Sequence, residues 1–504
     1  MILPIIYLCI RSFSDASEAW DLFFRERTIR TFFRTAMLII GVTGASIAIA
    51  VPIAWFTVRS NLPFRRVITV MAILPLSIPS YVGALVVIAV LGPKGSLQQG
   101  LEMLFNVERL PEIYGLPGAM LSLTLMSYPF VLLTVRSGLF KLDMALEETS
   151  RSLGSGQVLT FFRITLPQLR SSIAAGALLV ALYTLSDFGA VSLLRYETFS
   201  WSIFLQYEGF NRGLAAVQSL MLVVVAFLIL FGENKMRGKG RYYRVTSGAI
   251  RPLILMSLGR WRWPVFTFCT SIIFASLAVP VAILCYWTIQ GLYAGQTLDL
   301  MWGRALNSIL ISISASVITV VASLPIAFLS IRYPSWLNTL LEKLCYVGFA
   351  LPGIVVALAL IFFGINLAPL LYQTVFLLLF AYLILFLPVA LGVLRASILQ
   401  VNPSIEESAR SLGRARFWVL MTITLPLLRP AILAGASLVF IATLKELPAT
   451  LLLSPPGFQT LATSIWFAAS EAFFARAAAP ALLLILLASI PTTWLLLREG
   501  NLKQ

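Results

Sequence analysis

Long apolar runs alternate with short polar segments along almost the whole chain. A helix needs roughly 20 apolar residues to cross the hydrocarbon core of a bilayer, and most of these runs reach that length. The pattern therefore predicts an all-α, polytopic membrane protein. The expected spanning helices lie near residues 34–58, 67–91, 115–139, 172–194 and 213–232, and then near 264–288, 306–331, 344–366, 371–398, 431–453 and 474–497.

The chain also begins with an apolar segment, residues 1–10, which is too short to cross a bilayer alone. We interpret it as the end of a first spanning helix whose start lies upstream of Met1. An interfacial N-terminal helix is the alternative. Under the first interpretation the chain has about twelve spanning helices, six in each half.

One polar stretch occurs twice: residues 143–176 are repeated at residues 402–435, with every position shifted by 259 (402 − 143). Such a repeat indicates two similar halves, each exposing a loop of the same shape. Upstream the shift is 273, as from Pro52 to Pro325, so the first half carries about 14 extra residues (273 − 259) between the two regions. We expect a first repeat at 1–234, a basic linker at 235–262 and a second repeat at 263–504, with the repeated loops at 143–170 and 402–429.

Positive charge predicts the orientation of the chain in the membrane. Loops with net positive charge alternate with loops that carry little net charge, and basic loops stay in the cytoplasm. This alternation fits six spans per half with both termini inside. The two halves are then parallel repeats, related by an axis along the membrane normal. The cytoplasmic loops are residues 59–66, 141–170, 235–262 and 395–429.

Each repeated loop has the sequence signals of a short capped helix. In the second copy Asn402 is a good N-cap, and Pro403 occupies the first helical position, where its missing N–H costs nothing. We expect the helix to end at Leu412, because Gly413 can take the left-handed conformation that ends a helix. The first copy has Asp143, Leu153 and Gly154 at the equivalent positions.

Paired glutamates lie in the early turns of both helices, where the helix dipole favours negative charge. A cytoplasmic connector that pairs only with itself would explain one such loop. Two similar loops in otherwise diverged halves indicate two copies of one partner. The expected i,i+4 ion pairs are Glu147–Arg151 and Glu406–Arg410, and the prolines expected to mark the turn into the next span are Pro167 and Pro426.

The spacing Glu-Glu-(Thr/Ser)-(Ser/Ala)-x-x-x-Gly, with Ile-Thr-Leu-Pro after nine further residues, resembles the EAA motif of binding-protein-dependent ABC importer permeases. In that family the motif forms a coupling helix that inserts into a cleft of the ATP-binding subunit. Two motifs in one chain resemble the fused permeases of ferric-iron and thiamine importers. The resemblance implies a multi-pass protein of the bacterial inner membrane. It also implies two copies of an ATP-binding subunit on the cytoplasmic face and a soluble substrate-binding protein outside, in the periplasm or the extracellular space.

The same resemblance assigns roles by position. Glu147 and Glu406 would contact the ATP-binding subunit, and Gly154 and Gly413 would permit its close approach. The chain has no Gly-x-x-x-x-Gly-Lys-(Ser/Thr) loop. We therefore expect ATP to be bound by the partner, with no cofactor and no catalytic site in this chain. The expected coupling residues are Glu147, Glu148, Arg151, Gly154 and Pro167 in the first loop, and Glu406, Glu407, Arg410, Gly413 and Pro426 in the second.

Three charged residues fall inside predicted spans. Asp187 corresponds to Glu446 at the shift of 259, and Lys445 precedes Glu446. A charge at membrane depth is costly, so each should face a partner or a water-filled cavity. These side chains either line the transport path or its outer gate, or they form an ion pair that pins two helices. Gly189 and Pro448 follow the acids and are expected to break each helix there.

Composition argues against several other classes of protein. The chain is 59% apolar and 12% charged, whereas soluble domains are roughly 45–50% apolar and 25% charged. Its net charge of +16 lies between apolar runs and forms no continuous basic face, which argues against nucleic acid as a partner. Histidine is absent and the four cysteines are far apart, so no metal site is expected. The lack of a clustered nucleophile and base argues against a membrane-embedded enzyme.

Three segments of the sequence bear on the cargo. Residues 79–83, 91–95 and 185–196 resemble ferric-iron permeases in particular. Iron(III) prefers oxygen ligands, and a path with a few carboxylates is compatible with that preference. Thiamine, a polyamine or another small solute is the alternative cargo. A secondary transporter driven by an ion gradient is the alternative mechanism, although it would have no reason to duplicate a cytoplasmic loop.

Overall fold

The computed structural model describes residues 4, 6–8, 25–106, 110–142, 144–154, 156–237, 255–297, 299–333, 335–348 and 351–501. Within these ranges the chain is helical and has no β-strand; its β pairing is one isolated bridge between Ser60 and Met256. In the same ranges, nine helices are long and apolar enough to cross a membrane, or ten if one bent pair is counted as a single span. The all-α, polytopic fold predicted from the sequence is therefore confirmed.

The helices fall into two length classes. The long ones are α3 (Glu26–Arg59), α7 (Leu116–Lys141), α14 (Arg212–Arg237), α17 (Asp299–Arg332), α20 (Val375–Ile398), α23 (Leu425–Lys445) and α26 (Phe474–Asn501). The shorter ones include α4 (Arg65–Ile73), α5 (Ser80–Leu91), α6 (Ser96–Phe105), α11 (Arg170–Ser186), α12 (Gly189–Leu193), α13 (Phe199–Glu208), α15 (Arg262–Ile273), α16 (Val279–Tyr293), α18 (Trp336–Val347), α19 (Gly353–Asn366), α24 (Pro448–Leu453) and α25 (Leu461–Ser470).

Four of the predicted spans are broken, and the sequence predicted two of these breaks. The run near 67–91 divides into α4, a 3-10 turn and α5, because Pro75 and Pro79 cannot donate the hydrogen bonds that a continuous helix needs. The run near 344–366 divides in the same way into α18 and α19. The runs near 172–194 and 431–453 break after Ser186 and Lys445, as Gly189 and Pro448 predict.

The chain forms two compact units, and each unit contains parts of both sequence halves. The first-loop unit comprises Arg25–Trp201 and Val224–Tyr286. The second-loop unit comprises Met1–Phe24, Ser202–Val223 and Trp287–Gln504. The start of each half therefore belongs to the unit that is built mainly from the other half.

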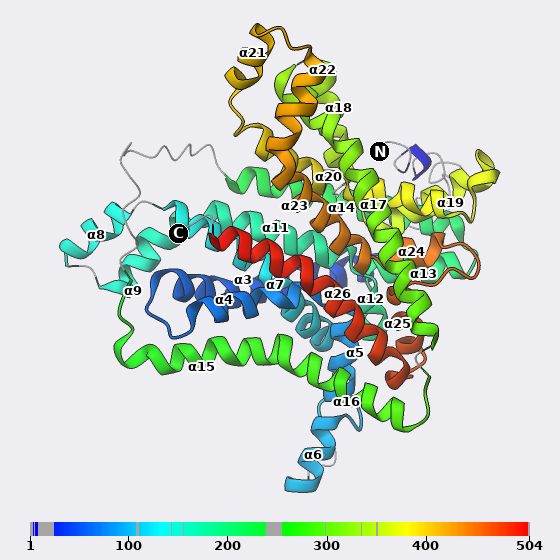
Figure 1. Cartoon of the computed structure of the whole chain (residues 1–504). Helices are drawn as coiled ribbons and strands as arrows, with labels where there is room; N and C mark the ends of the chain where they lie inside the picture. The colour runs from blue at the N-terminus through cyan, green and yellow to red at the C-terminus, as the bar shows by residue number, and fades with distance from the viewer. Residues whose placement is uncertain are drawn as a thin grey trace. The chain divides into compact units, whose positions relative to one another are not determined.

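The first-loop unit is organised around α3, α7 and α11, which pack on one another (Figure 1). A glycine permits a close approach of α11 to α7: a Cβ added at Gly176 would lie 2.7 Å from Cα of Val131. Small residues at such crossings let helix backbones approach closely in a membrane. The helix α15, which begins the second half of the sequence, packs against α4 of this unit.

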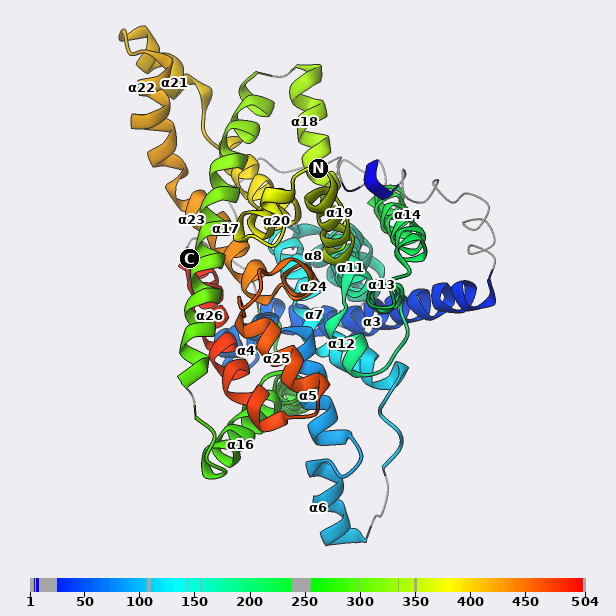
Figure 2. The same ribbon diagram turned by 90° about the vertical axis from the view of Figure 1, so that its right-hand side faces the viewer.

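The second-loop unit repeats the same three-helix arrangement with α17, α20 and α23 (Figure 2). Leu391, Leu394 and Ile398 of α20 are fully buried in its core, where they form one cluster with Ala327 of α17 and Leu428 of α23. The repeated loop lies beyond the end of α23, on the same side of the unit as α18. In both units, therefore, a three-helix core carries the loop at one end.

Candidate functional site

The second repeated loop contains a fully capped short helix, α21 (Pro403–Ser411). The side-chain oxygen of Asn402 accepts a hydrogen bond from the backbone N–H of Ser404 at 3.1 Å. Gly413 has φ +84°, and its N–H donates to the carbonyl of Arg410 at 3.0 Å. The next N–H, of Arg414, donates to the carbonyl of Ala409 at 3.3 Å, which completes a Schellman cap. The start and end signals predicted from the sequence are confirmed here.

The first loop has the same form. Its helix α8 (Met144–Ser152) has nine residues, as α21 has. Gly154 has φ +84°, identical to Gly413. The predicted N-cap Asp143 lies outside the described residues, and so does the side chain of Arg151. The two loops thus share one backbone shape, as their common sequence predicts.

The first glutamate of each pair turns inward. In the first loop, Oε1 of Glu147 accepts a hydrogen bond from the hydroxyl of Thr165 at 2.9 Å and lies 3.8 Å from a guanidinium nitrogen of Arg59. The Glu147 side chain is only 11% exposed. The carboxylate therefore has partners within its own chain.

The second loop repeats this arrangement. Oε1 of Glu406 lies 3.2 Å from a guanidinium nitrogen of Arg332 and accepts a hydrogen bond from the hydroxyl of Thr424 at 3.2 Å. The predicted pair of Glu406 with Arg410 is wrong, since the described ion pairs join this carboxylate to Arg332. Arg332, at the end of α17, is more buried than Arg410. An ion pair there is less screened than one between exposed groups one turn apart.

The sequence prediction did not single out Arg59 and Arg332. Each is the last residue of a 34-residue helix, α3 or α17. The signal was present: the two arginines correspond at the shift of 273 (332 − 59), the same shift that relates Pro52 to Pro325. Each guanidinium also donates to a backbone carbonyl near the start of its loop, of Leu139 at 3.2 Å and of Val401 at 2.9 Å.

The outer face of each loop is apolar at its tip and acidic beside it. Leu153 and Leu412, which precede the two glycines, are 80% and 85% exposed. Glu407 is exposed and Glu148 is half-buried, so the second glutamate of each pair faces outward more than the first. Further exposed apolar side chains follow at equivalent positions: Leu159 and Phe162 in the first loop, Trp418 and Met421 in the second.

A π-helical turn leads from each loop into the next spanning helix. It comprises Phe161–Thr165 in the first loop and Leu420–Thr424 in the second. Pro167 follows the first turn, and the helix then bends by 60° before α11, as predicted. Pro426 differs from Pro167 because it lies in the first turn of α23, which continues as one helix to Lys445. π-helical turns are frequent at functional sites, and here each one places the threonine that contacts the glutamate.

The two acids that fall inside predicted spans cap broken helices. Oδ1 of Asp187 accepts hydrogen bonds from the N–H groups of Ala190 at 3.0 Å and Val191 at 3.4 Å, at the start of α12. Oε1 of Glu446 accepts one from Ala449 at 3.1 Å, at the start of α24. The helix breaks are confirmed, and the carboxylates satisfy backbone groups that the breaks would leave unpaired.

Both acids also touch the first residue of another short helix. The hydroxyl of Ser80, which begins α5, hydrogen-bonds Asp187. A Cβ added at Gly353, which begins α19, would lie 2.4 Å from Oε1 of Glu446. Ser80 and Gly353 correspond at the shift of 273 (353 − 80). Lys445 is the last residue of α23 and is half-buried. Whether these three charges also line a path or gate stays a prediction.

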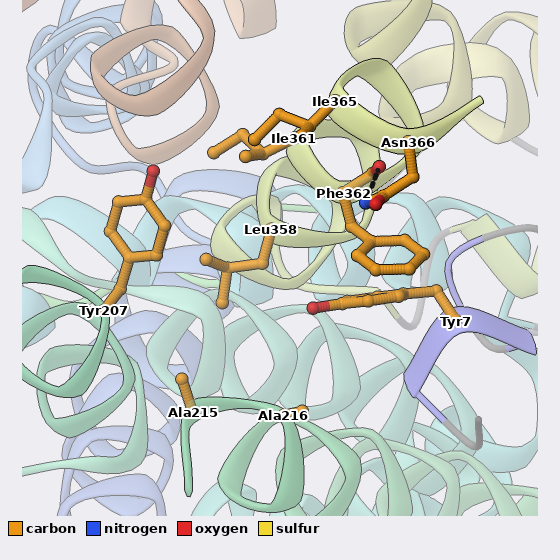
Figure 3. A pocket seen from close by; sticks show the side chains of 9 residues that line it. All are labelled: Tyr7, Tyr207, Ala215, Ala216, Leu358, Ile361, Phe362, Ile365 and Asn366. Atoms are coloured by element: carbon orange, nitrogen blue, oxygen red, sulfur yellow. Dashed lines mark hydrogen bonds between the residues drawn. The ribbon is translucent and has the colours of Figure 1, made fainter. Parts of the chain in front are cut away.

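A small pocket lies within the second-loop unit, with a volume of about 30 Å³ (Figure 3). Tyr7 stacks against Phe362 at its edge, with ring centroids 4.5 Å apart. A pocket of this volume has room for water. Among the described residues there is also no group of three or more Cys, Asp or Glu placed to hold a metal ion. The lining residues are Tyr7, Tyr207, Ala215, Ala216, Leu358, Ile361, Phe362, Ile365 and Asn366.

The chain matches one protein family and several individual transport permeases. Residues 43–233 and 319–497 each match the family described as binding-protein-dependent transport system inner membrane component. The chain is 37% identical over 495 residues to the Fe(3+)-transport system permease protein FbpB 2 of Haemophilus influenzae, covering 97% of this chain and 94% of that protein. It is 26% identical over 404 residues to the ferric transport system permease protein FbpB of Actinobacillus pleuropneumoniae, covering 76% of this chain and 58% of that protein.

A relative with a different named cargo matches only part of the chain. The probable sulfate transport system permease protein cysT of Chlorokybus atmophyticus is 26% identical over 250 residues, which cover 48% of this chain and 86% of that protein. Two matches to one family model and a relative that spans both halves agree with the internal repeat and the duplicated loop. The chain belongs to the family of binding-protein-dependent transport system inner membrane components, as a multi-pass permease subunit of an ABC importer with two fused repeats.

Proposed function

We propose that the two repeated loops are docking sites for two copies of one ATP-binding subunit on the cytoplasmic face. The observation that supports this most directly is the duplicated outer surface: Leu153 and Leu412 are both exposed beside a glycine of identical φ. An exposed leucine at the tip of a capped helix, beside an acid, suits an apolar pocket with a basic rim on the partner.

The inward position of Glu147 and Glu406 changes the roles proposed for the paired glutamates. Both carboxylates already have an arginine and a threonine as partners. We assign contact with the ATP-binding subunit to Glu148 and Glu407, whose side chains are less enclosed. Gly154 and Gly413 leave room for the approach, because nothing lies within 4 Å of a Cβ added at either position.

The proposed cargo is ferric iron. The two iron-transport relatives match 97% and 76% of this chain, whereas the sulfate relative matches 48% of it. Thiamine, a polyamine or another small solute is the competing cargo. A substrate-binding protein delivers the cargo to the outer face, and both termini of the permease lie in the cytoplasm.

The proposed mechanism is alternating access. Binding of ATP closes the two ATP-binding subunits, moves the docked loops and opens the helix bundle outward, and hydrolysis reverses the change. Each state must be favoured by different contacts for this cycle to be coupled. The chain contributes no phosphate-binding loop, so the partner subunits bind and hydrolyse ATP.

The docking proposal is tested by Leu153→Asp combined with Leu412→Asp. Because both side chains are exposed, the variant should accumulate in the membrane as the wild type does. It should lose the ATP-binding subunit on affinity purification and lose uptake of radiolabelled ferric iron. Leu399→Asp, at an exposed leucine of the second-loop unit outside both loop helices, is the control. Retention of the ATP-binding subunit and of uptake in the double variant would contradict the proposal.

The cargo is tested separately. Cells with and without the chain are compared for uptake of radiolabelled ferric iron and of radiolabelled thiamine. Iron uptake that depends on the chain supports the proposal. Thiamine uptake that depends on the chain, with unchanged iron uptake, refutes it.

A further inference from the structure

We infer that Arg59 and Arg332 are positioning residues that transmit movement of the docked loops to the long membrane helices. Each arginine, with its glutamate and threonine, forms what we call a loop anchor. The first loop anchor is Arg59, Glu147 and Thr165, and the second is Arg332, Glu406 and Thr424. The inference rests on the proposed docking of an ATP-binding subunit on the loops.

Each loop anchor joins three separate segments at one carboxylate oxygen. The arginine is the last residue of α3 or α17, the glutamate lies on the loop helix, and the threonine ends the π-helical turn. Both contacts are made by Oε1, in the first anchor and in the second. The loop helix is thereby bound on one side to the end of a 34-residue helix and on the other to the start of the next span.

The two loop anchors are retained although the sequence between their parts has changed length. Arginine and arginine correspond at a shift of 273, whereas glutamate and glutamate correspond at 259. The first half therefore has about 14 more residues between arginine and glutamate (273 − 259), yet the contact is the same. A contact that survives such a change in both halves is a requirement of the shared architecture.

Other described ion pairs do not repeat. Arg395 pairs with Glu342 at 3.0 Å in the second half, but Thr69 occupies the position of Glu342 in the first half (342 − 273). Arg30 pairs with Glu26 on α3, but Gly303 occupies the position of Arg30 in the second half (30 + 273). Among these pairs, the loop anchors are the ones that both halves keep.

Burial makes the link stiff. The side chains of Arg59 and Arg332 are 4% and 11% exposed, so moving the carboxylate away would break an ion pair whose arginine stays in a buried position. Displacing a loop therefore displaces the helix end with it. The helices α3 and α17 pack along α7 and α20, which carries the displacement into both cores.

The test uses the full chain purified with its co-expressed ATP-binding subunit. Two variants break the anchors from opposite sides: Arg59→Gln with Arg332→Gln, and Glu147→Gln with Glu406→Gln. A third variant exchanges the charged residues of each pair: Arg59→Glu with Glu147→Arg, and Arg332→Glu with Glu406→Arg. The control is Arg30→Gln, which removes an exposed pair on the same helix as Arg59. Measurements are membrane abundance, the amount of ATP-binding subunit recovered, ATP hydrolysis by the complex, and uptake of radiolabelled ferric iron.

We expect both anchor-breaking variants to retain the ATP-binding subunit and ATP hydrolysis within about twofold, while iron uptake per ATP hydrolysed falls at least tenfold. The charge exchange should restore uptake to within about threefold of wild type. A merely structural role would lower abundance, hydrolysis and uptake together.

Two results would overturn the inference: unchanged uptake per ATP in the broken variants, or loss of the ATP-binding subunit in step with uptake. If the broken variants do not accumulate, the charge exchange decides alone, since only a direct pair is restored by it. If no ATP-binding subunit is recovered with the wild-type chain, the proposed function is refuted instead.

Discussion

Replacing one glycine by alanine should change the stability differently at the crossing of α7 and α11 and at the equivalent crossing of α20 and α23 in the second half. Gly176 and Gly435 correspond at the shift of 259 (435 − 176), and both lie in the helix that follows a loop. A Cβ at Gly176 would lie 2.4 Å from Oγ1 of Thr134 and 2.7 Å from Cα of Val131. A Cβ at Gly435 would lie 3.7 Å from Cα of Ala390, an ordinary contact.

The magnitudes follow from these distances. A methyl group forced against the backbone at Val131 costs about 1–3 kcal/mol, as overpacking does elsewhere. At Gly435 the methyl group fits, and replacing glycine by alanine inside a helix gains about 0.5–1 kcal/mol. Gly176→Ala should therefore destabilise the first-loop unit, whereas Gly435→Ala should be neutral or stabilising.

The assay is thermal unfolding of the detergent-purified chain, followed by its tryptophan fluorescence. For a unit of this size, about 1 kcal/mol corresponds to about 2–4 °C in Tm. We expect Tm to fall for Gly176→Ala and to stay level or rise for Gly435→Ala. Equal destabilisation by both substitutions would refute the argument that helix spacing, rather than glycine itself, sets the requirement.

Substitutions at three further positions test the hydrogen bonds of individual side chains. Asp187→Asn keeps a side-chain oxygen for the α12 cap and should retain membrane abundance. Asp187→Leu removes the N-cap, which is worth about 1 kcal/mol, and should lower membrane abundance. Equal abundance of the two variants would contradict the capping role. Asn402→Ala should raise amide hydrogen exchange in α21 by about fivefold, from the loss of about 1 kcal/mol of capping, and unchanged exchange would show that Pro403 alone fixes the start. Tyr382→Phe removes a buried 2.7 Å bond to the Thr450 hydroxyl and should lower Tm by a few degrees, since a typical net hydrogen bond is worth about 1 kcal/mol; a higher Tm would mean that this bond costs stability.

Features encoded by neighbouring residues were predictable from the sequence. The apolar runs indicate where α3, α7, α17, α20 and α26 lie, because a spanning helix is defined by its own composition. The cap at Asn402 and the left-handed glycines follow for the same reason, since each depends on a few consecutive residues. Continuity of the spans was predicted less well, because apolarity persists through breaks such as the one at Pro75.

Features that depend on distant segments were not predictable in the same way. A lone arginine at the end of an apolar run is what the positive-inside rule predicts for any span, so the correspondence of Arg59 with Arg332 did not identify Glu147 as a partner. The pairing of Glu406 with Arg410 was predicted from helix spacing alone, and the end of α17 supplied a more buried partner. The carboxylate of Asp187 likewise caps a helix whose start the apolar pattern does not show.

The exchange of first segments between the compact units has a consequence for the integrity of the polypeptide. The helix α15 follows the linker in sequence, yet Ser276 beyond it hydrogen-bonds Tyr128 of α7 at 3.4 Å. A cut in the linker would therefore leave an N-terminal fragment whose unit lacks α15, and a C-terminal fragment carrying that helix with its packing surface uncovered. If the gene were split at this point, each product would need the other to complete its packing. Joining the two repeats in one chain ensures that both are made in equal amounts.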